Sequence, residues 1–152
     1  MVQEYYSGIV NVEFGNNVKI IHPVNLYGCK VGMDSFIGPF TEIQKNVVIG
    51  IGTKIQSHSF ICELVTIGSY CFIGHGVMFI NDSFDNGGPA NGNRTLWKET
   101  IIGNNVSIGS NSTILPVKIV DKVVIGAGSV VTKNILEPGV YAGNPAVKIR
   151  EL

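Results

Sequence analysis

The chain has 152 residues, which is enough for one domain with a continuous core. Its 11 Lys and Arg balance its 11 Asp and Glu, and no basic run occurs, so nucleic acid and anionic membrane surfaces are not expected partners. Charged residues make up only 14% and the mean hydropathy is +0.29, so we expect other subunits to cover part of the surface.

The sequence shows no targeting or membrane-spanning segment. Residues 1 to 10 contain Glu4 and no apolar run of signal-peptide length, and no run of eighteen apolar residues follows, so we expect a cytoplasmic protein. The 3 cysteines lack the spacing of a metal site. Cys29 and Cys71 are expected to fill the core, and no chemistry is assigned to Cys62.

An apolar residue recurs at every sixth position through the first half of the chain. Residues 9 to 30 carry a looser form of the pattern, and the frame is then unbroken at Val31, Ile37, Ile43, Ile49, Ile55, Ile61, Ile67, Ile73 and Phe79. Steps of six advance about 600° around an α-helix and would scatter these residues over its surface. A six-residue period instead indicates a coil repeat of short strands, with three hexads per turn and turns stacked about 4.8 Å apart.

A second track accompanies the first, two positions before each large residue. Its members are small or β-branched: Cys29, Ser35, Thr41, Val47, Thr53, Ser59, Val65, Cys71 and Val77. Residues two apart on a strand face the same way, so both tracks are expected to point inward. Glycine follows five of the nine large residues, where we expect a tight corner free of Cβ strain.

The frame stops after Phe79. Residues 81 to 100 are rich in Asn, Asp, Gly and Pro, which predicts a protruding loop, about 82–100, of a kind that is usually functional. The repeat resumes at Ile102, Ile108 and Ile114 and, after a five-residue step, continues from Ile119 to Val131. Residues 137 to 139 predict a turn that ends it, and residues 140 to 152 a brief strand and a capping tail.

Several segments together resemble the hexapeptide-repeat acyltransferases. They are the Ile-Gly hexads, the loop after Phe79-Ile80-Asn81-Asp82, residues 106 to 116, residues 125 to 133, and Ala142-Gly143-Asn144-Pro145-Ala146. The resemblance covers nearly the whole chain and implies an all-β fold, a left-handed parallel β-helix in a single domain 1–152. It further implies a homotrimer that transfers acetyl groups from acetyl-CoA at sites between subunits.

The segment from His75 to Asp82 is similar to that of N-acetyltransferases acting on nucleotide-linked amino sugars in surface-polysaccharide biosynthesis. A dTDP- or UDP-linked amino sugar is therefore the expected substrate. Relatives often continue this motif with an aromatic residue, Pro and Arg, whereas Ser83-Phe84-Asp85 follows here. Any sugar contact that depends on that Arg is therefore not carried over.

His75 and Asn81 are the expected catalytic residues. Acetyl transfer needs a path for a proton, which imidazole provides near neutral pH, and polar groups that hold the amine or the thioester carbonyl. Steps of eighteen place Ser57 below His75 and Glu63 below Asn81, so we expect one convergent polar stack of these four residues beside the loop. The non-catalytic alternatives are that His75 is only a surface residue and that Asn81 is only a turn residue.

Asp82, Glu63 and Phe84 are expected to contact the substrate, although Asp82 could instead cap the loop. The resemblance implies that CoA lies along the coils near Ser110, Ala127 and Gly128, with Lys133 close to its phosphates. The glycines could equally serve as corners. Trp97 could stack on a base or pack the loop. No metal is expected, because the close histidine pair of the carbonic anhydrases that share this solenoid is absent.

Two other functions remain open from the sequence. One is a sugar O-acetyltransferase of the same fold, since nothing in the sequence distinguishes an amine from a hydroxyl acceptor. The other is a non-catalytic trimeric scaffold or binding protein, which would not need a polar stack beside a long loop.

Overall fold

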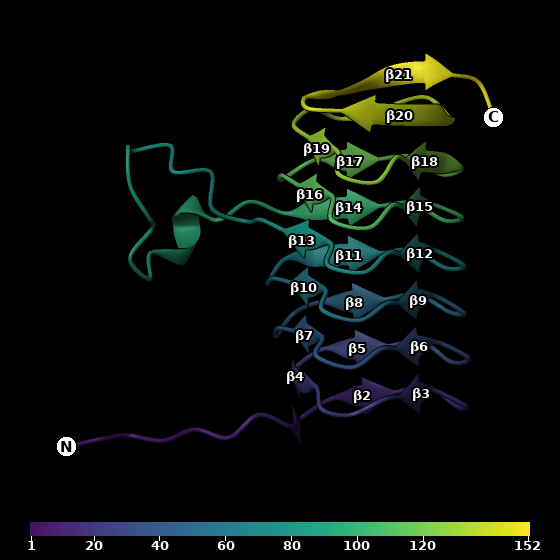
Figure 1. Ribbon diagram of the computed structural model, residues 1–152. Coiled ribbons are helices and arrows are strands. Elements are labelled where there is room, and N and C mark those ends of the chain that lie inside the picture. Colours follow the sequence, from purple (N-terminus) through teal and green to yellow (C-terminus); the bar gives the residue numbers. More distant parts are fainter.

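The computed structural model describes all 152 residues and shows a three-sided parallel β-helix (Figure 1). The seven-stranded first face contains, in order, β1 (Ile9–Val10), β4 (Asn25–Tyr27), β7 (Glu42–Ile43), β10 (Phe60–Ile61), β13 (Met78–Phe79), β16 (Thr113–Ile114) and β19 (Val130–Val131). The six-stranded second face contains β2 (Glu13–Phe14), β5 (Lys30–Val31), β8 (Val48–Ile49), β11 (Val65–Ile67), β14 (Thr100–Ile102) and β17 (Lys118–Ile119).

The eight-stranded third face contains β3 (Lys19–Ile20), β6 (Phe36–Ile37), β9 (Lys54–Ile55), β12 (Phe72–Ile73), β15 (Ser107–Ile108) and β18 (Val123–Ile125), followed by β20 (Gly139–Gly143) and β21 (Ala146–Arg150). Every strand pair is parallel except β20 with β21. The all-β fold is confirmed, and the arrangement is consistent with a left-handed β-helix. No helix of the chain combines the length and the apolar character that crossing a bilayer requires.

Both inward tracks are confirmed. Each of the nine large residues from Val31 to Phe79 is at most 3% exposed, and the small residues that precede them are buried as well. The coils stack in the expected register, with Ile37 beside Ile55 and Ile43 beside Ile61. The result is one continuous apolar cluster of 27 buried residues that runs the length of the helix.

The small inward hydroxyls have a specific role, because they donate to carbonyl groups at the corners. Ser35 Oγ donates to the Gly50 oxygen at 3.0 Å, and Ser59 Oγ donates to the Gly74 oxygen at 2.9 Å. No buried side-chain nitrogen or oxygen is left without a partner. Polar atoms therefore enter the core without the cost of an unpaired buried group.

The reason for the corner glycines differs from our expectation. Backbone strain is absent at Gly50, whose φ is not in the left-handed region. A Cβ there would instead lie 2.5 Å from the carbonyl carbon of Gly68 in the next coil. Close approach of stacked coils selects glycine at this place, whereas the left-handed corner conformation falls two residues later and is often adopted by other residues, such as Asp34, Phe40 and Asn46.

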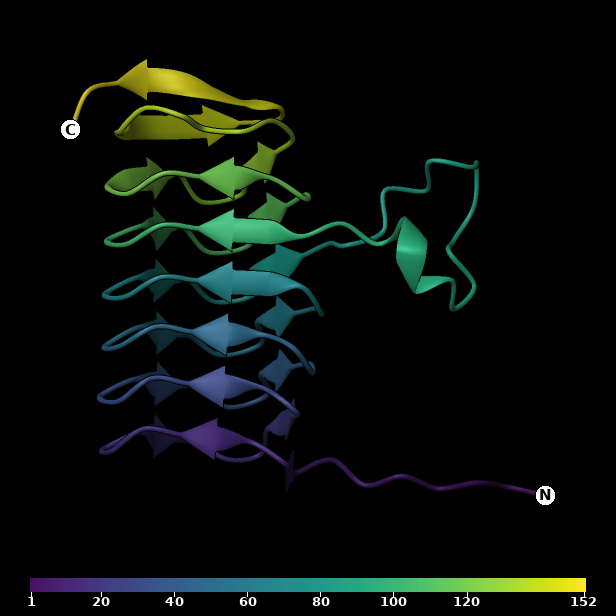
Figure 2. The same ribbon diagram turned by 180° about the vertical axis from the view of Figure 1, so that it is seen from behind.

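The protruding loop leaves the solenoid after β13 and returns at β14 (Figure 1). It contains one short 3₁₀ helix, η1 (Arg94–Leu96). The repeat continues across it, since Ile67 pairs with Ile102 and Phe79 pairs with Ile114. Seen from behind, the loop and the N-terminal segment project on the same side of the helix (Figure 2).

The C-terminal end corrects the prediction of a brief strand and a tail. β20 extends the third face by pairing with β18, and β21 folds back on β20 in an antiparallel hairpin. The turn between them uses Gly143, whose φ of 104° is accessible to glycine. The returning strand covers the sheet edge that the last coil would otherwise leave unpaired.

Candidate active site

The expected site residues lie at two different corners of the β-helix. We call the corner between the first and second faces the loop corner; it contains Gln44, Lys45, Glu63 and Asn81. We call the corner between the third and first faces the histidine corner; it contains Ser57, His75, Ser110, Ala127 and Gly128. The two corners lie at opposite ends of the strands of the first face.

The predicted stack of four polar residues is therefore wrong as a single cluster and right as two pairs. Ser57 Oγ lies 2.8 Å from His75 Nδ1, whereas Asn81 Nδ2 donates to the Glu63 carbonyl oxygen at 3.2 Å. The physical reason is the period itself. A step of six advances one face, and only a step of eighteen returns to the same corner one coil higher.

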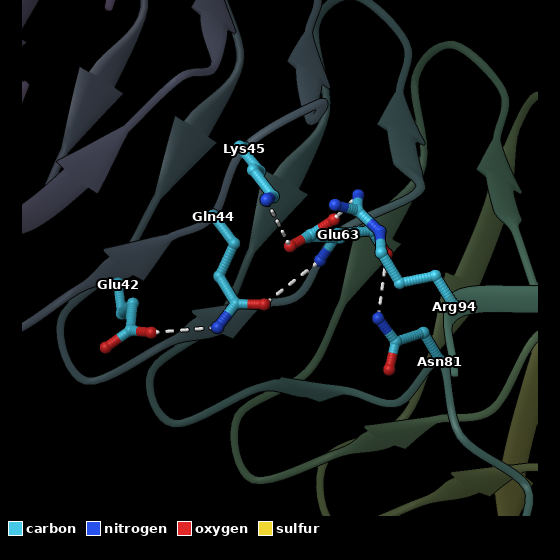
Figure 3. Close-up of polar contacts among 6 residues, drawn as sticks. All are labelled: Glu42, Gln44, Lys45, Glu63, Asn81 and Arg94. Atoms are coloured by element: carbon cyan, nitrogen blue, oxygen red, sulfur yellow. Dashed lines mark hydrogen bonds and ion pairs between the residues drawn. The ribbon is translucent and has the colours of Figure 1, made fainter. Parts of the chain in front are cut away.

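Glu63 is the most buried charged residue of the loop corner, with a side chain only 8% exposed. Its carboxylate is ion-paired with Arg94 of η1, and Lys45 Nζ lies 3.8 Å from its other oxygen. Figure 3 shows both cations converging on this group. The two cations compensate the buried charge, so Glu63 anchors the loop to the solenoid.

Asp82 is committed to the shape of the loop. One of its carboxylate oxygens accepts from the Phe84 N–H at 3.0 Å, and the other accepts from the Ala90 N–H at 2.7 Å. This geometry agrees with the loop-capping alternative that the sequence left open. A direct contact of Asp82 with substrate stays a prediction.

A cavity of about 620 Å³ opens between the loop and the first face. It is lined by aromatic and aliphatic side chains, among them Phe60, Phe84 and Trp97, and by the polar residues Gln44, Asn81 and Asp82. The Arg94 guanidinium lies over the Trp97 ring, 5.5 Å from its centroid, so Trp97 packs the loop while it also lines the cavity. An apolar cavity with a few convergent polar groups is typical of a small-molecule site.

The histidine corner forms a continuous polar column. The Gly76 N–H donates to the Ser57 carbonyl, the Asn111 N–H to the His75 carbonyl, and the Gly128 N–H to the Ser110 carbonyl, at 2.8 to 2.9 Å. His75 and the three small residues expected to bind CoA therefore share one corner. The His75 side chain is exposed, and Ser57 Oγ is the only protein group that hydrogen-bonds to it.

Lys133 lies apart from this column. It follows β19 at the turn from the first face to the second, and its ammonium forms no ion pair. Within one chain, the four residues expected to bind CoA are thus not brought together.

The cysteines and the remaining histidines show no arrangement for chemistry. Burial raises the pKa of the Cys62 thiol to about 12 and that of the Cys29 thiol to about 11, which keeps both protonated. The His58 ring stacks on Phe40, with centroids 4.8 Å apart. No three His, Cys, Asp or Glu side chains lie together as metal ligands would.

Sequence reasoning missed two residues of the loop corner and one residue of the loop that contacts it. Lys45 could have been found, because it precedes Glu63 by one 18-residue turn, and Gln44 is its neighbour. Arg94 could not, because the loop has no period that would place it against Glu63.

Comparison with known proteins shows which proteins this chain resembles. Residues 99–133 match the family model described as the hexapeptide repeat of succinyl-transferase. Over 126 residues the chain is 34% identical to the bifunctional protein GlmU of Streptococcus uberis, a match that covers 82% of the chain and 27% of GlmU. The chain thus spans about a quarter of the length of this curated relative.

Two solved structures are similar along most of their length. One is a variant of AntD, an N-acyltransferase from Bacillus cereus, in complex with dTDP and coenzyme A; it has a TM-score of 0.80 and 25% identity, covering 91% of this chain and 83% of AntD. The other is a hexapeptide-repeat acetyltransferase from Vibrio cholerae in complex with acetyl coenzyme A, with a TM-score of 0.69 and 26% identity, covering 82% and 71% of the two chains. These comparisons confirm the resemblance to the hexapeptide-repeat acyltransferases that the sequence predicts.

Proposed function

We propose that this protein is an acetyl-CoA-dependent N-acetyltransferase that acts on a dTDP- or UDP-linked amino sugar in surface-polysaccharide biosynthesis. The observation that carries the proposal is the likeness to the N-acyltransferase AntD, which was solved with dTDP and coenzyme A, over most of both chains. The two corners of this chain supply groups suited to the two substrates.

The histidine corner would hold the acyl donor. Pantetheine is an extended chain and fits a column of small residues such as Ser110, Ala127 and Gly128, which leads to His75. If His75 carries its proton on Nδ1, that N–H donates to Ser57 Oγ, and Nε2 keeps a lone pair that can accept a proton. In that tautomer Ser57 orients the imidazole and leaves Nε2 free to act as the base.

The loop corner would hold the acceptor. Its cavity of about 620 Å³ combines apolar walls, suited to the flat faces of a base or a sugar, with the half-buried Asn81. Asn81 Oδ1 accepts no hydrogen bond from the protein, so it is available to an N–H of the substrate.

The two corners can meet only if a second copy contributes one of them. Two exposed apolar side chains, Phe72 at 42% and Met78 at 40%, flank the histidine corner on its two faces. A neighbouring subunit that covered them would bring its own loop corner toward His75. This requirement agrees with the homotrimer that the family resemblance implies.

The reaction then proceeds by addition and elimination. The lone pair of the neutral amine attacks the thioester carbonyl carbon, which forms the C–N bond and places charge on the carbonyl oxygen. His75 Nε2 takes the proton that the nitrogen must lose. Collapse of the tetrahedral intermediate breaks the C–S bond, and the CoA thiolate receives a proton to leave as the free thiol.

The test is thiol release from acetyl-CoA with a panel of dTDP- and UDP-linked 3-amino and 4-amino sugars, each beside its hydroxyl analogue. Release with one amino sugar and not with its hydroxyl partner supports the proposal. Release with hydroxyl acceptors alone makes the protein a sugar O-acetyltransferase, a candidate that Asn81 Oδ1 also favours because it accepts equally from O–H. No release across the panel would favour a scaffold and refute the enzymatic proposal.

A further inference from the structure

A chain of side-chain amides beneath the loop is oriented by a carboxylate at its far end. Glu42 accepts from Asn25 Nδ2 and from Gln44 Nε2, both at 3.1 Å (Figure 3 shows the second contact). A carboxylate has no proton to donate, so the NH₂ end of Gln44 must face Glu42. Its other end, Oε1, then faces the Glu63 main-chain N–H, which donates to it at 3.2 Å.

The next contact is made by the Glu63 main-chain carbonyl, on the other side of the same residue. The Glu63 carbonyl oxygen can only accept, and it receives Asn81 Nδ2 at 3.2 Å. The NH₂ end of Asn81 is therefore turned to the solenoid, and Oδ1 points away from it (Figure 3). The main chain of Asn81 is fixed too, since its carbonyl oxygen accepts the Lys98 N–H at 2.8 Å.

The Tyr27 phenol also lies beside this chain: burial raises its pKa, and a hydrogen bond with the Gln44 side chain lowers it, as the NH₂ end of Gln44 would. The Glu63 carboxylate, which could otherwise attract an NH₂ group, is occupied by Arg94 and faces Lys45. Asn81 lines the cavity under the loop, and its Oδ1 accepts no hydrogen bond within the chain. Asn81 Oδ1 is thus a hydrogen-bond acceptor of fixed position for a ligand in the cavity. The carboxylate of the next residue, Asp82, already accepts two loop N–H groups.

We propose that Gln44 is a positioning residue that fixes the Asn81 carboxamide with Oδ1 toward the cavity and so selects a substrate with an N–H or O–H donor. This inference rests on the proposed function for the identity of the ligand, because Asn81 must face the acceptor sugar. A sugar with an amine or hydroxyl at that point satisfies Oδ1, whereas one with a carbonyl or an ether oxygen leaves two acceptors opposed. Gln44 itself need not touch the reacting atoms.

The first test needs no substrate. Protein labelled with ¹⁵N-asparagine shows the Asn81 side-chain NH₂ signals, identified by their loss in Asn81→Ala. Gln44→Met keeps the length of the side chain and removes its hydrogen bonds. It should shift these signals and accelerate their exchange with water about fivefold or more, as expected when an anchored group is released.

Gln56→Met is the matched control. Gln56 holds the same place in the repeat, one residue after a buried Ile, and is half-buried, but its side chain makes no hydrogen bond. It should leave the Asn81 signals unchanged. Unaltered signals in Gln44→Met, or equal changes in both variants, would overturn the inference. Glu42→Gln provides a second, nearly isosteric variant that removes the constraint at the start of the chain and should also accelerate exchange.

The second test uses the amino sugar that reacts in the panel. Gln44→Met should raise its KM about fivefold and leave the KM of acetyl-CoA within twofold, and it should have no further effect in the Asn81→Ala background. Additive effects of the two substitutions, or an equal rise in both KM values, would show a general structural role and refute the proposal. If no sugar reacts, the proposed function fails, while the NMR experiment still decides the role of Gln44.

Discussion

Removal of the His75 imidazole tests the proposed mechanism most directly. The loss of a general base lowers turnover by about 10²–10⁴-fold, which corresponds to about 2.7–5.4 kcal/mol of transition-state stabilisation. The side chain is exposed and its only hydrogen bond is with Ser57 Oγ at 2.8 Å, so His75→Ala should lower the free energy of unfolding by no more than about 1.5 kcal/mol, the most that one such bond contributes. Activity and stability are thus separable at this position.

Ser57→Ala provides the comparison for this experiment, because it separates loss of the hydrogen bond from loss of the imidazole. It removes one hydrogen bond worth about 0.5–1.5 kcal/mol and leaves the imidazole in place, so turnover should fall about 2- to 10-fold. Steady-state thiol release across pH 6 to 9, with thermal melts of each variant, measures both quantities. A loss below tenfold in His75→Ala with an unchanged melt would refute the role of His75 as base and indicate an amine that binds already neutral.

Three further predictions follow from the loop corner and the core. Asn81→Ala should raise the KM of the acceptor about tenfold and leave that of acetyl-CoA unchanged in the same assay; an unchanged acceptor KM would remove Asn81 from the site. Arg94→Met should release the loop at a cost of about 1.5–3 kcal/mol, seen as faster proteolysis within residues 82–99; cleavage at the native rate would contradict the anchoring role of Glu63. The three buried thiols should resist Ellman's reagent at pH 8 until the protein is unfolded, and fast labelling of the native protein would contradict this. The free energy of unfolding should fall as pH rises from 9 towards 11, because the folded state holds the Cys29 proton more tightly than the unfolded chain does.

The fold could be predicted from the sequence because the inward-facing residues recur at a fixed spacing. A six-residue step with two inward tracks determines strand, corner and stacking together, and the pairing of Ile37 with Ile55 follows from it directly. The corner glycines were placed correctly for an incomplete reason, since contact with the next coil becomes visible only when coils are stacked. The C-terminal hairpin was missed because β21 runs antiparallel to the rest and carries no hexad signal.

The candidate site was only partly accessible for a related reason. The vertical neighbours Ser57 with His75 and Glu63 with Asn81 follow from the 18-residue turn, and both contacts exist. Arg94 reaches Glu63 from a loop without a repeat, so no spacing predicts it. The separation of the two corners is consistent with the proposed homotrimer, in which a neighbouring copy would complete the site.

The base of the loop, where residues 81 and 98 meet, separates the solenoid, whose residues are constrained by the repeat, from the loop, whose residues are not. The Lys98 N–H closes it by donating to the Asn81 carbonyl oxygen at 2.8 Å, and the coils on either side continue in register. Loop length adds little entropic cost once the ends are joined. An excursion of different length or composition could therefore be grafted at this point without disturbing the solenoid, so that a change of acceptor would require new residues in only one short insert.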